Sequence, residues 1–241
     1  MKLIVYNGSP RGKDSNTKIL LTHFLNGFMA VDGNSFELAY LVHINEHEKL
    51  IELFSTADHV LFAFPLYFDS MPSNVKYFIE ELEPFCHRQD NPSLGFIVQS
   101  GFPESRHSRA LERYLKKLAA RLNCTYKGTI IRGSVEAIKM LAQLENPFQK
   151  FIVSMGKITN MGQVGGFFSI DKLYKQFYQL GLQFGQSATL DRKIIEQLAK
   201  PEKLTRLGFQ LFKSVGDHFY WNNWLKKNKA FKKRFDAPYS Q

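Results

Sequence analysis

Residues 3–17 of this chain read LIVYNGSPRGKDSNT, and this stretch decides the fold. Its first four residues are apolar and partly β-branched, and the run ends at Asn7-Gly8, which predicts a buried strand followed by a loop. Beyond the loop, apolar residues recur at helical spacing between Asn16 and Met29. A buried strand, a polar loop and an amphipathic helix in this order are the opening of an α/β domain.

The same alternation of strand and helix continues to about residue 135. Further strands are predicted at residues 36–41, 60–64, 94–98 and 126–132, and helices at residues 50–54, 74–82 and 108–122. The strands are apolar along their length, and such strands are buried on both faces of a parallel sheet. The pattern therefore predicts an α/β fold with a five-stranded, doubly wound parallel sheet, either flavodoxin-like or half of a dinucleotide-binding fold.

The rest of the chain shows helical spacing without a further strand. Apolar stripes fall at residues 138–144, 148–155, 173–184, 194–198 and 204–219. We therefore expect two parts, an α/β domain at residues 1–135 and a helical C-terminal extension at residues 136–241. The extension would pack on that domain or on the second copy of a dimer.

The composition restricts the class of protein. The chain has 241 residues, of which 44% are hydrophobic and 22% charged, so global disorder is excluded. Its two cysteines, Cys86 and Cys124, cannot form a disulfide framework or a structural zinc site, and free thiols suit a reducing compartment. The first apolar run is too short for a signal peptide, and no apolar run is long enough to span a membrane. We therefore expect a cytoplasmic protein.

The net charge of +10 is unevenly distributed. Residues 200–241 hold ten Lys or Arg against three Asp or Glu, a net of +7, which leaves only +3 for the rest of the chain. In the last part, lysines interleave with Trp221, Trp224 and Phe231. Such a segment could lie on an anionic bilayer. The plainer interpretation is a helix packed on protein with its lysines in solvent, and we expect no nucleic-acid partner.

The loop after the first strand has the chemistry of an anion site. Its three hydroxyls belong to Ser9, Ser15 and Thr17, and its guanidinium belongs to Arg11. The predicted helix begins at Asn16, so the helix N-terminus lies in the same place. The helix N-terminus offers N–H groups, and the side chains add hydrogen bonds, which suits a phosphate monoester. The loop matches neither the Walker sequence nor the G-x-G-x-x-G dinucleotide pattern. The alternative is an ordinary strand–helix turn with Ser15 as its N-cap.

The loops after the third and fourth predicted strands reach the same edge of the sheet, where such folds bind ligands. The first begins Pro65-Leu66-Tyr67-Phe68, and its two aromatic side chains could stack on a planar ring. The second begins Ser100-Gly101, where glycine allows a close approach of the backbone. The alternative for the first loop is an aromatic cover over its own sheet.

Together these residues resemble the flavodoxin-like NAD(P)H-dependent FMN reductases. Asn7-Gly8-Ser9-Pro10-Arg11 with Ser15-Asn16-Thr17 is similar to the FMN phosphate loop of that family, and Pro65-Leu66-Tyr67 with Met71-Pro72 and Lys76-Tyr77-Phe78-Ile79 is similar to its ring-binding segment. The likeness covers about residues 1–135. Tyr220-Trp221 and Asp236-Ala237-Pro238-Tyr239 resemble a bacterial branch with a helical extension.

The resemblance implies a sheet in the order 2-1-3-4-5 and a bound FMN. Its phosphate would be held by Ser9, Arg11, Ser15, Asn16 and Thr17, and its ring by Pro65, Leu66, Tyr67, Phe68, Ser100 and Gly101. Hydride would pass from NADPH or NADH to the flavin, and electrons then to a quinone, free flavin, azo or nitro compound, without a catalytic acid or base. Related enzymes are often homodimers. The alternatives are a non-enzymatic electron carrier of flavodoxin type, and a flavoprotein held at a membrane surface by the basic tail.

The chain departs from the family pattern at two places. Glu80-Glu81 stands where the family often has Asp-Arg. Residues 43–58 contain no cysteine, which excludes the iron–sulfur cluster found in one branch of the family. The same segment holds His43 and His47 at a spacing of four residues, and we expect a solvated pair there rather than metal ligands.

Overall fold

The computed structural model of the chain describes residues 1–102, 105–135, 170–200 and 221–233. The chain divides into two compact units, one made of Met1–Lys139 with Ser169–Glu202 and the other of Met140–Phe168 with Lys203–Gln241. The first unit carries the sheet. Of the second unit, the structure describes residues 221–233.

The first unit is built on a five-stranded parallel sheet with the strand order β2-β1-β3-β4-β5. The strands are β1 (Lys2–Asn7), β2 (Ser35–Tyr40), β3 (His59–Pro65), β4 (Ser93–Gln99) and β5 (Tyr126–Arg132). The predicted flavodoxin-like sheet and all five predicted strands are therefore confirmed. The three central strands are almost entirely buried, as expected for apolar runs covered on both faces.

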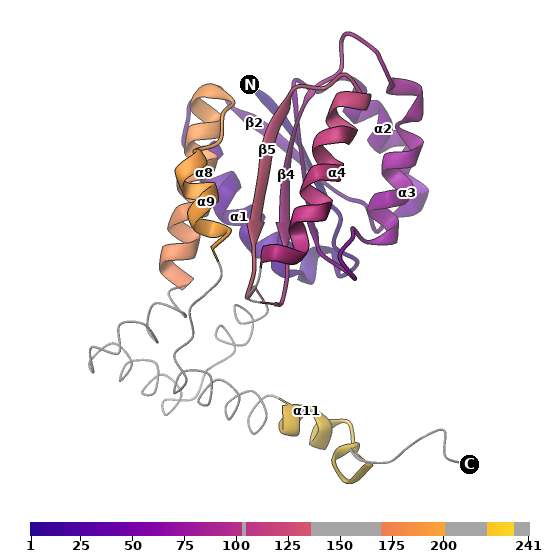
Figure 1. The fold of residues 1–241 in the computed structure, drawn as a ribbon, viewed down its shortest axis with the longest axis vertical. Coiled ribbons are helices and arrows are strands. Elements are labelled where there is room, and N and C mark those ends of the chain that lie inside the picture. The colour runs from indigo at the N-terminus through magenta and orange to yellow at the C-terminus, as the bar shows by residue number, and fades with distance from the viewer. Residues whose placement is uncertain (103–104, 136–169, 201–220, 234–241) are drawn as a thin grey trace. The chain divides into compact units, whose positions relative to one another are not determined.

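Helices cover both faces of this sheet. They are α1 (Asn16–Phe28), α2 (His47–Ser55), α3 (Ser73–Glu81), α4 (Ser108–Arg121), α8 (Ile170–Ser187) and α9 (Arg192–Leu198). Figure 1 shows α1, α8 and α9 on one side of the sheet and α2, α3 and α4 on the other. These helices agree with the predicted ones to within about three residues at most ends. The predicted stripes at residues 138–144, 148–155 and 204–219 lie outside the described residues.

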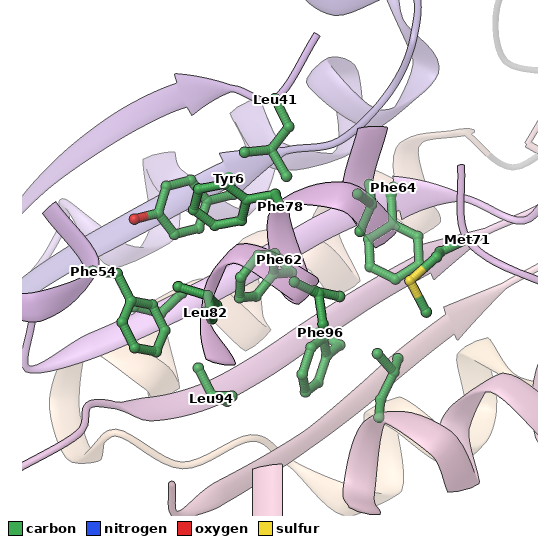
Figure 2. Packing of buried hydrophobic residues seen from close by; sticks show 14 of the residues in the cluster. Tyr6, Leu41, Phe54, Phe62, Phe64, Met71, Phe78, Leu82, Leu94 and Phe96 are labelled. Atoms are coloured by element: carbon green, nitrogen blue, oxygen red, sulfur yellow. The ribbon is translucent and has the colours of Figure 1, made fainter. Parts of the chain in front are cut away.

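Two apolar cores result from the alternation of side chains along the strands. On one face, Tyr6, Phe62 and Phe96 form an aromatic row that packs against α2, α3 and α4 (Figure 2). The ring centroids of Tyr6 and Phe62 lie 5.0 Å apart, and those of Phe62 and Phe96 5.8 Å apart. On the other face, Leu3 and Val5 contribute to the core under α1, α8 and α9.

One strand departs from the expectation of burial on both faces. The first three residues of β2, Ser35–Glu37, are exposed. This strand lies at the edge of the sheet and pairs with β1 alone. An edge strand is covered less completely than a central one, so an apolar run alone did not reveal its exposure.

Helices α1 and α8 approach each other closely through glycine. A Cβ atom added at Gly181 of α8 would lie 1.8 Å from the carbonyl oxygen of Phe24 in α1. A Cβ atom added at Gly27 of α1 would lie 2.0 Å from the carbonyl oxygen of Tyr178 in α8. The two backbones therefore touch directly, without side chains between them.

Two histidines that lie against α8, His23 and His59, are expected to make the stability of the fold depend on pH. Burial lowers the pKa of His23, whose ring stacks on Tyr174 of α8 at a centroid distance of 3.7 Å. Burial and the neighbouring charge of Lys127 lower the pKa of His59, although Asp58 opposes this effect. Both groups therefore prefer the neutral form in the folded chain.

We expect the free energy of unfolding to fall as the pH is lowered below about 6.5, the ordinary histidine pKa. The unfolded chain then binds protons that the folded chain binds only at lower pH, so acid favours unfolding. His23→Phe keeps a ring against Tyr174 and should flatten this slope in urea titrations at several pH values. Asn26→Ala, on the exposed face of α1, should leave the slope unchanged. Stability that rises toward acid would contradict the assignment.

Candidate functional site

The candidate site lies where the carboxyl ends of the parallel strands meet. The strand order reverses between β1 and β3, and open α/β sheets bind ligands at this point. The loop after β1 is held against the end of β3 there, because the Gly8 N–H donates to the carbonyl of Ala63 in that strand at 2.8 Å. The predicted phosphate loop and the predicted ring loop are therefore neighbours.

Asn7 organises the loop after β1 from within. Its side-chain oxygen accepts a hydrogen bond from the Ser9 N–H at 3.0 Å, and its amide donates to the Gly12 carbonyl at 3.3 Å. Gly12 has a φ of +53°, a conformation that glycine adopts without strain. The loop is thus held in one shape by a buried side chain at the end of the strand.

Ser15 has its hydrogen-bonding capacity engaged by the same loop. Its hydroxyl donates to the Gly12 carbonyl at 2.7 Å and accepts from the Lys18 N–H at 3.1 Å. The second contact makes Ser15 the N-cap of α1, which was one of the two interpretations of this residue. In this structure the hydroxyl shapes the loop and the start of the helix.

The other predicted phosphate ligands gather at the start of α1. Ser9, Asn16 and Thr17 are buried, and Arg11 is exposed at the tip of the loop. The Thr17 hydroxyl accepts a hydrogen bond from the side-chain amide of Gln99 at 3.3 Å. The first turn of α1 contains no acidic residue that would repel an anion. Hydroxyls, a guanidinium and a helix N-terminus thus form a donor set that fits a phosphate group.

The loop after β3 forms a tight, strained turn. The backbones of Tyr67 and Ser70 exchange hydrogen bonds of 2.8 and 2.9 Å, and the two residues between them, Phe68 and Asp69, have φ values of +47° and +60°. Turns of this shape normally use asparagine, aspartate or glycine. A phenylalanine there costs energy, and strain of this kind gathers at functional sites. The turn leaves the Phe68 ring fully exposed and the Tyr67 ring half-exposed.

The loop after β4 is fixed against the neighbouring strands. The Ser100 N–H donates to the Arg132 carbonyl at 2.9 Å, and the Ser100 hydroxyl donates to the Phe102 carbonyl at 3.2 Å. Gly101 and the Phe102 ring are exposed. Further along, Nδ1 of His107 lies 3.0 Å from a carboxylate oxygen of Asp69, in the turn after β3. The loops after β3 and β4 are therefore in contact.

The remaining predicted ring contacts lie at the base of the turn. Pro65 is the buried last residue of β3, and the Leu66 N–H donates to the Gln99 carbonyl at 2.7 Å. All eleven predicted residues thus fall on the three loops or their immediate strand and helix ends. Their placement along one edge of the sheet is consistent with a single ligand that has a phosphate and a flat ring.

Sequence reasoning missed three residues of this edge. The Gln99 amide binds Thr17 and so joins β4 to the phosphate loop. The Asn74 amide donates to the Gly8 carbonyl at 3.2 Å and joins α3 to the same loop. The Ser134 hydroxyl is buried without a hydrogen-bond partner in the described structure, and its backbone has a φ of +58°. Gln99, a polar residue ending an otherwise apolar strand, was the one clear signal in the sequence.

The expectation of a solvated histidine pair is wrong for His47. This residue is buried, and its Nδ1 lies 2.7 Å from a carboxylate oxygen of Glu81 while its Nε2 lies 3.0 Å from the Leu41 carbonyl. The carbonyl oxygen only accepts, so the ring donates to it through Nε2 and turns Nδ1 toward the carboxylate. His43 precedes the helix and is exposed. Within the described residues, no cluster of three metal-ligating side chains occurs.

The fold is that of a flavodoxin-like protein, with a loop rich in hydrogen-bond donors at the switch point of the sheet and aromatic side chains beside it. The model of the family described as NADPH-dependent FMN reductase matches residues 1–129, just over half of the chain. The chain therefore belongs to the NADPH-dependent FMN reductase family. A search of curated proteins gives no match.

Solved structures show the same fold at low sequence identity. An FMN-dependent NADH-azoreductase from Bacillus anthracis str. Ames Ancestor in complex with FMN is 13% identical, with a TM-score of 0.52 over 77% of this chain and 100% of that one. A flavone reductase is 13% identical, with a TM-score of 0.56 over 82% of this chain and 65% of that one. At such identities the likeness concerns the fold.

Family membership establishes the general activity. The chain is an enzyme, an FMN-dependent oxidoreductase that uses NAD(P)H, with FMN and NAD(P)H as its cofactors. This assignment agrees with the prediction from the loops and leaves a non-enzymatic carrier without support. The electron acceptor is a separate question.

Proposed function

We propose that this enzyme passes electrons from NAD(P)H through FMN to a small, planar, electron-poor acceptor such as a quinone, free flavin, azo or nitro compound. The observation that carries the proposal is the exposed pair of rings, Tyr67 and Phe68, on a strained turn beside the phosphate loop. The backbone strain at Phe68 destabilises the turn, and the turn keeps these rings in solvent. Flat aromatic surfaces favour flat, polarizable partners.

The phosphate end of FMN would be held at the start of α1. Ser9, Arg11, Asn16 and Thr17 would donate to the phosphate oxygens, while Ser15 keeps the helix capped and the loop closed. Gln99 would hold Thr17 in place. Bound FMN would supply the redox chemistry by accepting a hydride and releasing electrons.

The ring end would lie along the loops after β3 and β4. Pro65, Leu66, Tyr67 and Phe68 would contact one side and edge of the ring, and Ser100 and Gly101 the other. The contact between Asp69 and His107 would keep these two loops at a fixed separation. The exposed Phe102 ring lies on the same edge and would border the place where nicotinamide and acceptor alternate.

Oligomeric state and location are further parts of the proposal. We expect a homodimer in the cytoplasm, with small molecules as its substrates. Both cysteines are free thiols, and burial raises the pKa of Cys124 to about 12, so that thiol stays protonated and unreactive. Light scattering of the purified protein measures the oligomeric state.

The test is a two-step reduction of the purified holoprotein. The protein should be yellow, and anaerobic NADPH or NADH should bleach it within seconds. Addition of a quinone or azo dye should then restore the colour. A screen of both nucleotides against quinones, azo dyes, nitro compounds and free flavins would identify the acceptor. A flavin that binds but is not bleached by either nucleotide would overturn the proposal.

Matched variants separate the aromatic turn from general effects. Phe68→Ala should raise the KM for the acceptor several-fold and leave FMN bound. Tyr114→Ala removes a half-exposed ring from α4, away from the turn, and should leave the KM unchanged. Equal effects of the two substitutions would show that the turn does not select the acceptor.

A further inference from the structure

The described part of the second unit carries an unusual concentration of charge and aromatic side chains. Residues 221–233 read WNNWLKKNKAFKK, with five lysines and no acidic residue. Trp221 and Trp224 are the only two tryptophans of the whole chain. We define this segment as the basic aromatic patch.

The patch is locally ordered around a short helix, α11 (Asn222–Lys227). The Ala230 N–H donates to the Leu225 carbonyl at 2.8 Å, and Lys229, with a φ of +55°, closes the helix end. The rings of Trp221 and Trp224 stack at a centroid distance of 6.1 Å. The ammonium of Lys226 lies 5.3 Å from the centre of the Phe231 ring. These contacts hold aromatic and basic side chains together on one short stretch.

Both tryptophans are exposed despite their size. Trp221 is 53% exposed and Trp224 55% exposed. The five lysines are also exposed. Two stacked indoles in solvent lose the favourable burial that tryptophan normally gains, which is on the order of 25 cal/mol per Å² of apolar surface. More than half of the surface of each tryptophan therefore stays accessible to a partner.

We propose that the basic aromatic patch binds the surface of anionic lipid bilayers. Indole rings suit the boundary between headgroups and acyl chains, because they combine an apolar body with one N–H donor. Lysines beside them bind anionic headgroups, and each contributes about 1 kcal/mol near such a surface. Binding would be peripheral, since no helix of the described residues is long and apolar enough to cross a membrane.

Charge argues against a second copy of this chain as the occupant. Two such patches facing each other would bring ten lysines together without an acidic partner, and the chain as a whole carries +10. Like charges in contact cost energy unless they are paired. An anionic bilayer supplies the opposite charge and an apolar layer for the indoles together. Nucleic acid would satisfy the lysines and could stack on the rings, but it offers Leu225 no apolar layer.

The intrinsic fluorescence of the full-length holoprotein tests the proposal directly. Because both tryptophans lie in the patch, tryptophan emission reports on this segment alone. Vesicles of mixed phosphatidylglycerol and phosphatidylcholine should shift the emission to shorter wavelength and sediment the protein at about 0.15 M salt. Pure phosphatidylcholine vesicles should bind it much more weakly. The measurement is independent of the proposed electron acceptor, because it uses neither nicotinamide nor acceptor.

Two charge-matched triple variants separate the patch from general basicity. Lys226→Gln, Lys227→Gln and Lys229→Gln together should weaken vesicle binding by about a hundredfold and keep both indoles as reporters. Lys116→Gln, Lys117→Gln and Lys193→Gln together remove the same charge from α4 and α9 and should leave binding nearly unchanged. All six lysines are exposed, so both proteins should fold.

Each other result overturns the proposal. Emission that does not shift with anionic vesicles shows that the indoles do not enter a bilayer. Equal losses in the two triple variants show attraction by net charge rather than by the patch. Indoles protected from acrylamide without vesicles show that protein covers them. Tighter binding to single-stranded RNA than to the vesicles, at the same salt, makes nucleic acid the partner.

Discussion

Gly181→Ala should lower the free energy of unfolding by about 3 kcal/mol and the melting temperature by about 10 °C. The new methyl group would lie 1.8 Å from the Phe24 carbonyl oxygen and 3.0 Å from the Phe28 nitrogen, both backbone atoms of α1. Backbone atoms cannot move aside as a flexible side chain can, so α1 and α8 would have to separate. Their separation would open the core around Phe177 and Phe184.

Alanine is otherwise favoured over glycine in a helix by about 1 kcal/mol, so the intrinsic preference opposes the expected loss. Gln179→Ala, on the exposed face of the same helix, serves as the control and should change stability by less than about 0.5 kcal/mol. Thermal and urea unfolding of the three proteins measure the difference. A Gly181→Ala protein as stable as the parent would mean that the two helices do not touch.

The sheet of this protein was predictable because its strands are short, apolar and separated by polar loops. Residues 60–64 and 94–98 are apolar throughout, so strands formed by them must be buried on both faces. A helix between successive strands of this kind favours parallel pairing. The partner of the apolar stripe at residues 173–184 was not predictable. Helical spacing identifies an apolar face, but it does not indicate which element of the fold covers that face. The structure packs that stripe against α1 through Gly181, Gly185 and Gly27.

The site was predictable to the level of loops and not to the level of atoms. The residue types around Ser9–Thr17 and Pro65–Phe68 indicate their chemistry directly, and strand ends bring them to one edge. The partners of these residues come from distant parts of the sequence, as Gln99 does for Thr17 and Asn74 for Gly8. His47 illustrates the same limit, because its ring is paired with Glu81 of another helix. Glu81 is also the position where the chain departs from the family pattern.

Arg11→Ala should weaken FMN binding by about ten- to a hundredfold. A hydrogen bond to a charged group contributes about 1.5–3 kcal/mol, and the guanidinium is the one full positive charge among the predicted phosphate ligands. Riboflavin carries the same ring without the phosphate, so its affinity should be unchanged in the variant. Fluorescence titration of the apoprotein with both flavins measures the two constants side by side.

Lys13→Ala is the matched control, because it removes the same charge from an exposed position of the same loop. Screening reduces the effect of a charge that touches no phosphate oxygen, so FMN affinity should fall by less than about threefold. Ser15→Ala should act differently again, lowering stability by about 1 kcal/mol through the lost N-cap. If Arg11→Ala weakened FMN and riboflavin equally, the guanidinium would act through loop shape, and the phosphate would have to be held by Ser9, Thr17 and the N-terminus of α1.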